Sequence, residues 1–206
     1  MSDGDTQIAG WKTADDWQAF SSSLAIGGDR WQEAFDEYFR TRLDLRYLNP
    51  IKLLQDHGTF QGEGFSILAL QCTLVEFLES TVQGVNYRYL RTGEKLAPRE
   101  YSISSDLFVR FLSTRDPFKQ DFDEALAQDF YSGVRCGLLH EARTKNGWTV
   151  LAKGPADNVI DRNKRIVYRD NFQTALEKFV VSYGADLLTD ASLQEAFIRK
   201  FNSLCV

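Results

Sequence analysis

The chain has 206 residues, of which 43% are hydrophobic and 26% charged, the ordinary composition of a globular domain with a substantial core. Its formal net charge of −5 argues against non-specific coating of nucleic acid, which needs a net basic surface, but permits a local basic site. The three cysteines lack paired metal-ligand spacing, so neither a disulfide framework nor a zinc site is expected. With a polar N-terminus that does not resemble a secretory signal, this predicts a cytoplasmic protein.

The first predicted helix is short and belongs to an N-terminal extension, residues 1–28. Thr13 followed by Asp16 three residues later has the spacing of a capping box, which starts helices. A helical domain is then expected over residues 29–206, with Asp29 as the cap of its first helix. Apolar residues recur there at three- and four-residue steps. We expect that helix to end before Pro50, because proline disfavours a helical residue ahead of it.

The most apolar part of the chain begins at Phe65. A helix from about residue 65 to residue 83 is apolar on nearly all sides until Glu76 and Glu79, which predicts the central buried helix. The apolar run 65–75 is too short and too interrupted to span a bilayer, so no membrane partner is expected.

Residues 84–101 show no helical or strand period and predict an extended loop that mixes cations with aromatic rings. This combination suits single-stranded RNA, where bases stack on rings and phosphates meet cations. A solvated loop with its aromatic rings packed on the core also explains this composition, and it is the preferred interpretation. The residues concerned are Tyr87, Arg88, Tyr89, Arg91, Lys95, Arg99 and Tyr101.

The last part of the chain combines helices with short strand signals. A helix is expected over residues 118–142, followed by a turn and strand-like residues around 148–151, 159–160 and 165–168. Further helices follow, the last of them capped by Asp190. The predicted fold class is all-α, a helical bundle with a small β-hairpin inserted after the 118–142 helix.

The C-terminal end of the 118–142 helix carries the most informative residues. Arg135 is permanently cationic and its fork of donors matches phosphate oxygens, whereas His140 is of the residue type that most readily exchanges protons near neutral pH. On an ideal helix their side chains point about 140° apart, with Arg143 between them. Such a wide polar arc suits a site that a second copy of the same helix completes across a two-fold axis.

A purely structural explanation of the same residues is available. Arg135 would pair with Glu76 or Glu79 of the central helix, His140 would sit favourably at the helix C-terminus, and Arg143 would be a solvated charge. Judged on spacing alone, this explanation is the better one.

The segment from Phe130 to Trp148, with Arg135, four intervening residues and His140 after an apolar helix, resembles the HEPN superfamily. The resemblance implies an all-helical HEPN-like fold over about residues 29–206 and a homodimer. It also implies a metal-independent endoribonuclease in a toxin or antiviral-defence setting, with RNA as substrate and an antitoxin or regulatory protein as a further partner. No cofactor is expected. A polar residue, commonly asparagine, follows the arginine in active members, and here that position is Cys136.

The resemblance also assigns roles within the site. Arg135 and His140 are the predicted catalytic residues, and Cys136 lies where substrate binds. From its place on the same helix, Arg143 is expected to add a phosphate contact. Glu76 and Glu79 are expected either to orient the arginine or simply to form the polar end of the central helix. Cleavage would proceed by attack of the ribose 2′-OH and leave a 2′,3′-cyclic phosphate and a 5′-hydroxyl. The alternatives are a non-catalytic HEPN-like module that binds RNA, a nucleotide or a protein, and an unrelated helical interaction protein.

Overall fold

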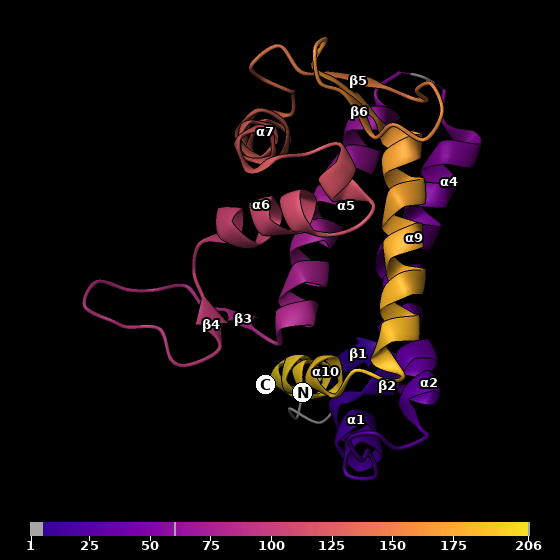
Figure 1. Ribbon diagram of the computed structural model, residues 1–206, viewed down its shortest axis with the longest axis vertical. Coiled ribbons are helices and arrows are strands. Elements are labelled where there is room, and N and C mark those ends of the chain that lie inside the picture. Colours follow the sequence, from indigo (N-terminus) through magenta and orange to yellow (C-terminus); the bar gives the residue numbers. More distant parts are fainter. Residues whose placement is uncertain (1–5, 60, 206) are drawn as a thin grey trace. The chain divides into compact units, whose positions relative to one another are not determined.

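The computed structural model describes residues 6–59 and 61–205, and the chain is predominantly helical with three small sheets (Figure 1). This confirms the predicted helical class at that level. The α-helices are α1 (Ala14–Ser21), α2 (Trp31–Ala34), α3 (Thr41–Leu43), α4 (Asn49–His57), α5 (Glu63–Gln83), α6 (Ser104–Thr114), α7 (Glu124–Phe130), α8 (Cys136–Glu141), α9 (Arg169–Leu187) and α10 (Ala191–Ser203). Three π-helical segments, η2 (Phe35–Arg40), η3 (Asp44–Leu48) and η5 (Tyr131–Arg135), and the 3-10 turn η4 (Phe118–Gln120) join them. The strands are β1 (Gln7–Ala9), β2 (Lys12–Thr13), β3 (Asn86–Tyr87), β4 (Glu100–Tyr101), β5 (Thr149–Leu151), β6 (Ile160–Asp161) and β7 (Ile166–Tyr168).

The chain forms two compact units, each assembled from separate stretches of sequence. Unit 1 contains the chain up to Asn49, Ser80–Ser102 and the chain from Ser182 onward. Unit 2 contains Pro50–Glu79 and Ile103–Val181. This division differs from an extension over 1–28 followed by one helical domain over 29–206. The local breaks near residue 28 are visible in sequence, whereas the contacts that group distant stretches are not.

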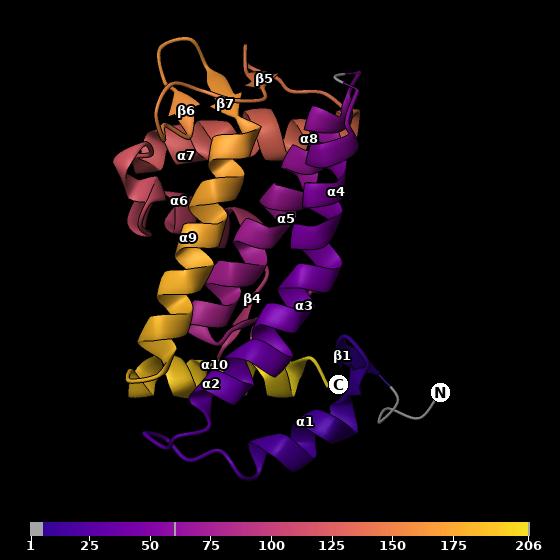
Figure 2. The same ribbon diagram turned by 90° about the vertical axis from the view of Figure 1, so that its right-hand side faces the viewer.

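Unit 1 has an aromatic core that includes the N-terminal helix. Trp17 of α1 is fully buried; its ring lies 5.0 Å from that of Tyr38 and 5.1 Å from that of Phe201 in α10. Its indole nitrogen donates a 2.7 Å hydrogen bond to Asn202, so the buried polar atom is satisfied. Figure 2 shows α1 and α10 together in this unit. The first predicted helix is therefore part of a core.

The predicted caps are present at the starts of α1 and α10. The Thr13–Asp16 capping box is present at the start of α1, and Asp190 accepts hydrogen bonds from the first backbone N–H groups of α10. The prediction for Asp29 is wrong: α2 begins at Trp31 after Arg30, without a side-chain cap.

The predicted helix end before Pro50 is also wrong, because helical backbone continues into α4 through Pro50. The preceding segment, η3, is π-helical, and Asn49 donates its backbone N–H to the carbonyl oxygen of Asp44, five residues back. A normal helical turn would press the proline ring against a carbonyl four residues earlier. The wider π turn relieves that contact.

Helix α5 is the expected central helix of 21 residues. It is the one helix in the described residues that is long and apolar enough to cross a membrane by length and composition, with a mean hydropathy of 1.4. Of that apolar window, 56% is buried inside the protein, as in the core helix of a folded domain.

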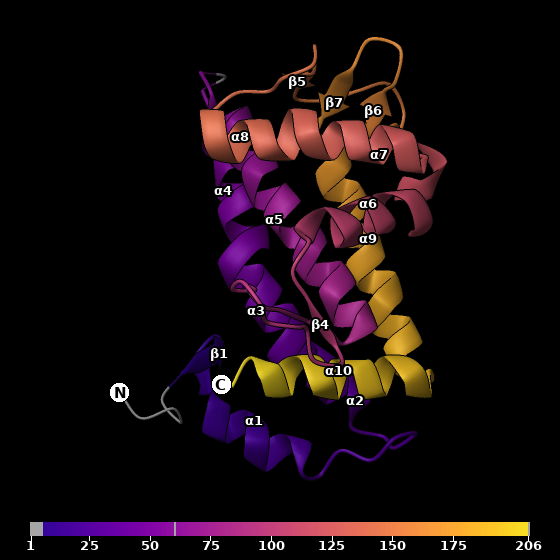
Figure 3. The same cartoon turned by 90° about the vertical axis from the view of Figure 1, so that its left-hand side faces the viewer.

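Unit 2 places the 118–142 segment against an aromatic cluster. Figure 3 shows α7, η5 and α8 following one another along one direction, with α6 beside α7. Phe130 is fully buried at the end of α7. Its ring lies 5.1 Å from that of Trp148, 5.3 Å from that of Phe122 and 6.0 Å from that of Phe172. This burial fixes the position of the following residues, Tyr131–Glu141.

The β-structure after α8 is a three-stranded sheet, larger than the predicted hairpin. Strands β6 and β7 are antiparallel, as expected, but β5 pairs with β7 in parallel, so the strand order is β5-β7-β6. Periodicity located the strand residues but does not specify which strands pair.

Two glycines four residues apart let the turn after α8 lie directly on the helix. The backbone N–H of Lys145 donates a 2.7 Å hydrogen bond to the carbonyl oxygen of Gly133. A Cβ atom on Gly133 would lie 2.7 Å from the Trp148 ring, and one on Gly137 would lie 2.5 Å from the carbonyl oxygen of Arg143. Neither contact is tolerated without a shift of the turn.

We therefore expect Gly137→Ala to destabilise the protein by about 1–3 kcal/mol, the usual cost of overpacking. The atom that it meets belongs to the backbone and cannot rotate away. Thermal unfolding followed by circular dichroism measures the effect. Gln128→Ala on the exposed face of α7 is the control and should stay within about 0.5 kcal/mol of wild type. Equal melting temperatures for the two variants would contradict the close approach.

Candidate functional site

The predicted motif lies where a π-helical turn meets an α-helix. In η5 the backbone N–H of Cys136 bonds to the carbonyl oxygen of Tyr131, five residues back. Arg135 is the last residue of this turn, and His140 lies in the last turn of α8. The helix ends at Ala142, whose φ of 53° is left-handed. Single π turns inside helices are frequent at functional sites.

The Arg135 guanidinium is held from two sides. One of its nitrogens lies 3.6 Å from a carboxylate oxygen of Glu76 in α5, and the two side chains are 19% and 18% exposed. The guanidinium carbon lies 5.2 Å from the centre of the Tyr131 ring, a cation–π distance. The predicted contact between Arg135 and Glu76 is thus confirmed. The arrangement fixes a cation while leaving about a fifth of its surface accessible.

Glu79, the other acid predicted to support Arg135, holds two other arginines. Its carboxylate is fully buried; it accepts two 2.9 Å hydrogen bonds from Arg115 and one of 3.1 Å from Arg110. A hydrogen bond to this carboxylate raises the pKa of Arg115. The Glu79 carboxylate, which the sequence assigns to the support of Arg135, therefore binds two other arginines. Arg110 and Arg115 were not singled out in the sequence, because their pairing with α5 spans more than 30 residues.

The His140 imidazole is exposed at the end of α8. Within residues 6–59 and 61–205, its side chain makes no hydrogen bond or ion pair. The backbone closes the helix end instead, since the N–H of Ala142 bonds to the carbonyl oxygen of Gly137. His140 is thus accessible to an external partner.

Arg143 is exposed but already paired. Its guanidinium makes hydrogen bonds of 2.9 and 3.1 Å to one carboxylate oxygen of Glu141, and Lys145 donates to the other at 2.7 Å. These hydrogen bonds lower the pKa of Glu141, the Lys145 bond most. To contact phosphate, Arg143 must leave Glu141. That exchange is inexpensive, since exposed ion pairs contribute only about 0–1 kcal/mol.

Cys136 lies half-buried beside the arginine, in a group of residues that includes a second thiol. Cys72 of α5 is fully buried, and burial raises its pKa to about 12 while the Arg135 guanidinium opposes the rise. Burial likewise raises the pKa of the Tyr131 hydroxyl, again opposed by Arg135. Both groups are therefore neutral at physiological pH. The groups that surround Arg135 in the described residues include the Glu76 carboxylate, the Tyr131 ring and the thiols of Cys72 and Cys136.

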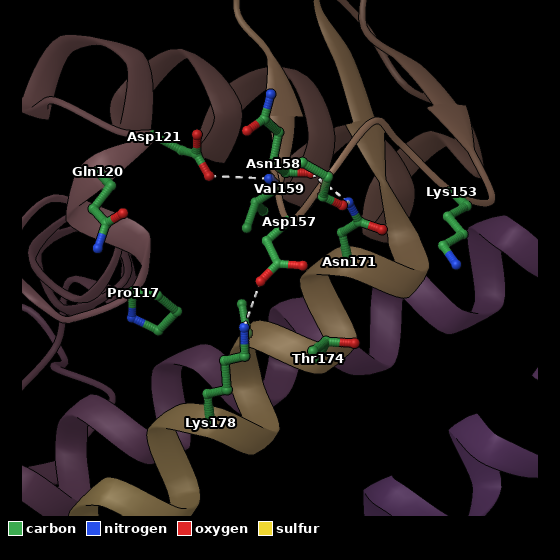
Figure 4. Close-up of a pocket in the computed structure, with 12 residues that line it drawn as sticks. Pro117, Gln120, Asp121, Lys153, Asp157, Asn158, Val159, Asn171, Thr174 and Lys178 are labelled. Carbon is green, nitrogen blue, oxygen red and sulfur yellow. Dashed lines mark hydrogen bonds and ion pairs between the residues drawn. The ribbon is translucent and has the colours of Figure 1, made fainter.

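A polar cavity of about 360 Å³ lies elsewhere in unit 2 and contains none of the predicted site residues. Figure 4 shows it between the 153–158 loop and α9, with Lys178 bonded to Asp157 and Asn171 bonded to the loop backbone. Its volume lies at the low end for small-molecule sites. Four charged residues line it, of which Lys153, Asp157 and Lys178 are exposed and Asp121 is half-buried, so the hollow gives no enclosed binding site.

No cluster of three or more histidine, cysteine, aspartate or glutamate side chains within the described part of the chain could hold a metal ion. Comparisons with protein families, curated proteins and solved structures found no match to this chain. The resemblance of residues 130–148 to the HEPN superfamily therefore depends on the motif and the order of the helices alone.

Proposed function

We propose that this protein is a HEPN-like endoribonuclease that cleaves RNA by 2′-OH transesterification, in the cytoplasmic toxin or antiviral-defence setting that the resemblance implies. The observation that carries the proposal is the presence of two different groups on one short helix, Arg135 at the start of α8 and His140 in its last turn. Arg135 is fixed by Glu76 and Tyr131 with part of its guanidinium accessible, and His140 is exposed and without a partner among the described residues. A fixed cation and an accessible proton carrier are the two components that phosphodiester cleavage needs.

In the proposed mechanism, the ribose 2′-oxygen attacks the adjacent phosphorus while an imidazole takes its proton. The bond from phosphorus to the 5′-oxygen breaks, and this oxygen receives a proton from a second acid. Arg135 holds the non-bridging oxygens as negative charge builds on them. One His140 cannot be base and acid in the same step, so the His140 of a second copy supplies the other proton transfer. The products are a 2′,3′-cyclic phosphate and a 5′-hydroxyl.

The dimer is testable through Leu139, an apolar residue of α8 that is 48% exposed beside His140. Wild type should sediment at twice the chain mass of 23.5 kDa at micromolar concentration, and Leu139→Arg should sediment as a monomer. A buried arginine without a partner is too costly for an interface to accept. Leu53→Arg, at a residue of α4 that is 61% exposed, is the matched control and should remain dimeric. A monomeric wild type would contradict the assembly.

A non-catalytic module that binds RNA, a nucleotide or a protein is the second candidate. The Glu76–Arg135 pair favours it, since a structural role inside unit 2 already accounts for that arginine. Incubation of the protein with RNA in excess chelator separates the two candidates. Cleavage products ending in a 2′,3′-cyclic phosphate support the nuclease, and bound but intact RNA supports the module. Cleavage that requires added magnesium or manganese would contradict the proposed chemistry.

A further inference from the structure

The segment 87–101, which connects β3 to β4, is held by hydrogen bonds at its two ends and is exposed between them. The backbone N–H of Asn86 donates to the carbonyl oxygen of Arg99 at 2.9 Å, and that of Arg88 to the carbonyl oxygen of Tyr101 at 2.8 Å. Figure 1 shows the loop projecting away from these short strands. Every residue from 91 to 99 is exposed. The loop is thus fixed at its ends and open to solvent between them.

The acidic side chains of the 87–101 loop are bound within the loop itself. Arg88 lies 3.2 Å from Glu100 and 3.6 Å from Glu94. Glu100 also accepts the backbone N–H of Ala97 at 2.7 Å, and Glu94 accepts that of Arg91 at 3.2 Å. The hydrogen bond from Ala97 contributes most to the lowered pKa of Glu100. Both carboxylates are therefore turned toward one arginine and the loop backbone.

The other cations of the loop have no such partners. Arg91, Lys95 and Arg99 make no ion pair with any residue that the structure describes. The sequence 87–101 contains four cations and two acids, so it is locally basic in a chain whose formal charge is −5. Three exposed, unpaired cations on one short loop form an attractive surface for a polyanion.

Two tyrosine rings lie among these cations. Tyr89 is 74% exposed and Tyr87 is 54% exposed. The ring of Tyr87 is steadied by an edge-to-face contact with Tyr101 at 5.7 Å, which leaves its orientation defined. Solvent-exposed rings flanked by cations are the arrangement by which proteins stack bases and track phosphates of single strands.

We propose that the 87–101 loop is a binding site for single-stranded nucleic acid, with bases on Tyr89 and Tyr87 and phosphates on Arg91, Lys95 and Arg99. A duplex fits less well, because the loop offers neither a helix nor a two-stranded ribbon to fill a major groove. An anionic membrane also fits less well, since Leu96 is the one exposed large aliphatic side chain within the loop, too little apolar surface for insertion. The inference requires binding only and does not depend on RNA cleavage.

The test measures binding of a fluorescent uridine 12-mer that carries 2′-O-methyl groups, which block attack by the 2′-oxygen. Anisotropy titrations compare full-length wild type with two loop variants, Tyr89→Leu and the triple variant Arg91→Gln/Lys95→Gln/Arg99→Gln. Removal of one stacked ring should weaken binding about 5- to 150-fold. The triple variant should lower the slope of log affinity against log salt by about 2, because three phosphate contacts to a single strand are lost.

Two control variants separate this site from general effects of charge and aromatic surface. Lys52→Gln/Lys119→Gln/Lys164→Gln removes three exposed cations outside the loop and should bind as wild type does. Trp11→Leu removes a ring that is 90% exposed in the β1–β2 turn and should also bind normally. Equal losses in loop and control variants would overturn the proposal, as would the absence of oligonucleotide binding at 50 mM salt. Binding confined to vesicles of anionic lipid would also overturn it, in favour of a membrane surface.

The outcome also remains separate from that of the proposed nuclease. If His140→Ala binds the oligonucleotide as wild type does and no RNA is cleaved by either protein, the nuclease proposal fails and the loop site stands. If wild type cleaves RNA but the loop variants bind and cleave normally, the loop proposal fails and the nuclease stands.

Discussion

His140→Ala should reduce RNA cleavage by about 100- to 10,000-fold, the usual contribution of a positioned acid or base. The same substitution should leave the melting temperature close to that of wild type. The imidazole is exposed and makes no hydrogen bond or ion pair among the described residues, so truncation removes nothing that supports the fold. Cleavage of a labelled RNA and thermal unfolding are measured on the same preparation.

Arg135→Ala should reduce cleavage by about 100- to 1,000-fold, since it removes the group that stabilises charge on the phosphate. Its effect on stability differs from that of His140→Ala. Glu76 is 18% exposed, and the loss of its arginine should cost about 1–3 kcal/mol. Arg135→Lys is the matched variant: it retains the charge but not the fork of donors, so it should recover stability better than cleavage.

Arg143→Ala separates the predicted substrate contact from the two catalytic residues. Arg143 is bound to Glu141 and its side chain is 68% exposed, so stability should stay near that of wild type while cleavage falls less than in the other two variants. Normal cleavage by His140→Ala would contradict the mechanism directly. A large fall in melting temperature for Arg135→Ala, together with wild type that cleaves no RNA, would leave Arg135 a structural residue of unit 2.

The sequence identifies the residues of the site better than it identifies which of them contact one another. The long apolar run located α5, and Glu76 and Glu79 at its polar end were both predicted as partners of Arg135. The sequence did not distinguish between them, whereas the structure places Glu76 beside Arg135. Cys72 lies four positions before Glu76, so both lie on one face of α5. The sequence does not predict that Cys72 lies near Arg135, because nothing in a single sequence places this face against the Arg135 turn.

The differences between the sequence expectations and the structure come from contacts that local sequence rules do not describe. The π turn before Pro50 overrides a local rule that is sound for ordinary helices. Trp17 resembles a side chain of a separate extension until Phe201, 184 residues later in the sequence, covers it. Gly133 and Gly137 have helical spacing, but the sequence does not show that the Lys145 turn packs directly on them. Local patterns predict elements, whereas pairing depends on which surfaces meet.

Arg115→Met should destabilise the protein by about 3 kcal/mol, the lower end of the range for breaking a buried ion pair. Arg115 donates two hydrogen bonds to Glu79, whose side chain is fully buried, and is itself 28% exposed. Methionine fills a similar volume but leaves the carboxylate with one arginine fewer. For a chain of this length, the melting temperature should fall by about 6–12 °C.

Arg110→Met is the matched control, because it removes the second arginine from the same carboxylate. Arg110 makes one hydrogen bond of 3.1 Å and is 59% exposed, so its loss should cost about 0–1 kcal/mol, as for a surface ion pair. The order of the two variants tests whether the fork of donors from Arg115 is what stabilises the buried Glu79 side chain inside unit 2. Equal costs would mean that the two arginines share this role. A negligible cost for Arg115→Met would mean that other contacts of Glu79 suffice.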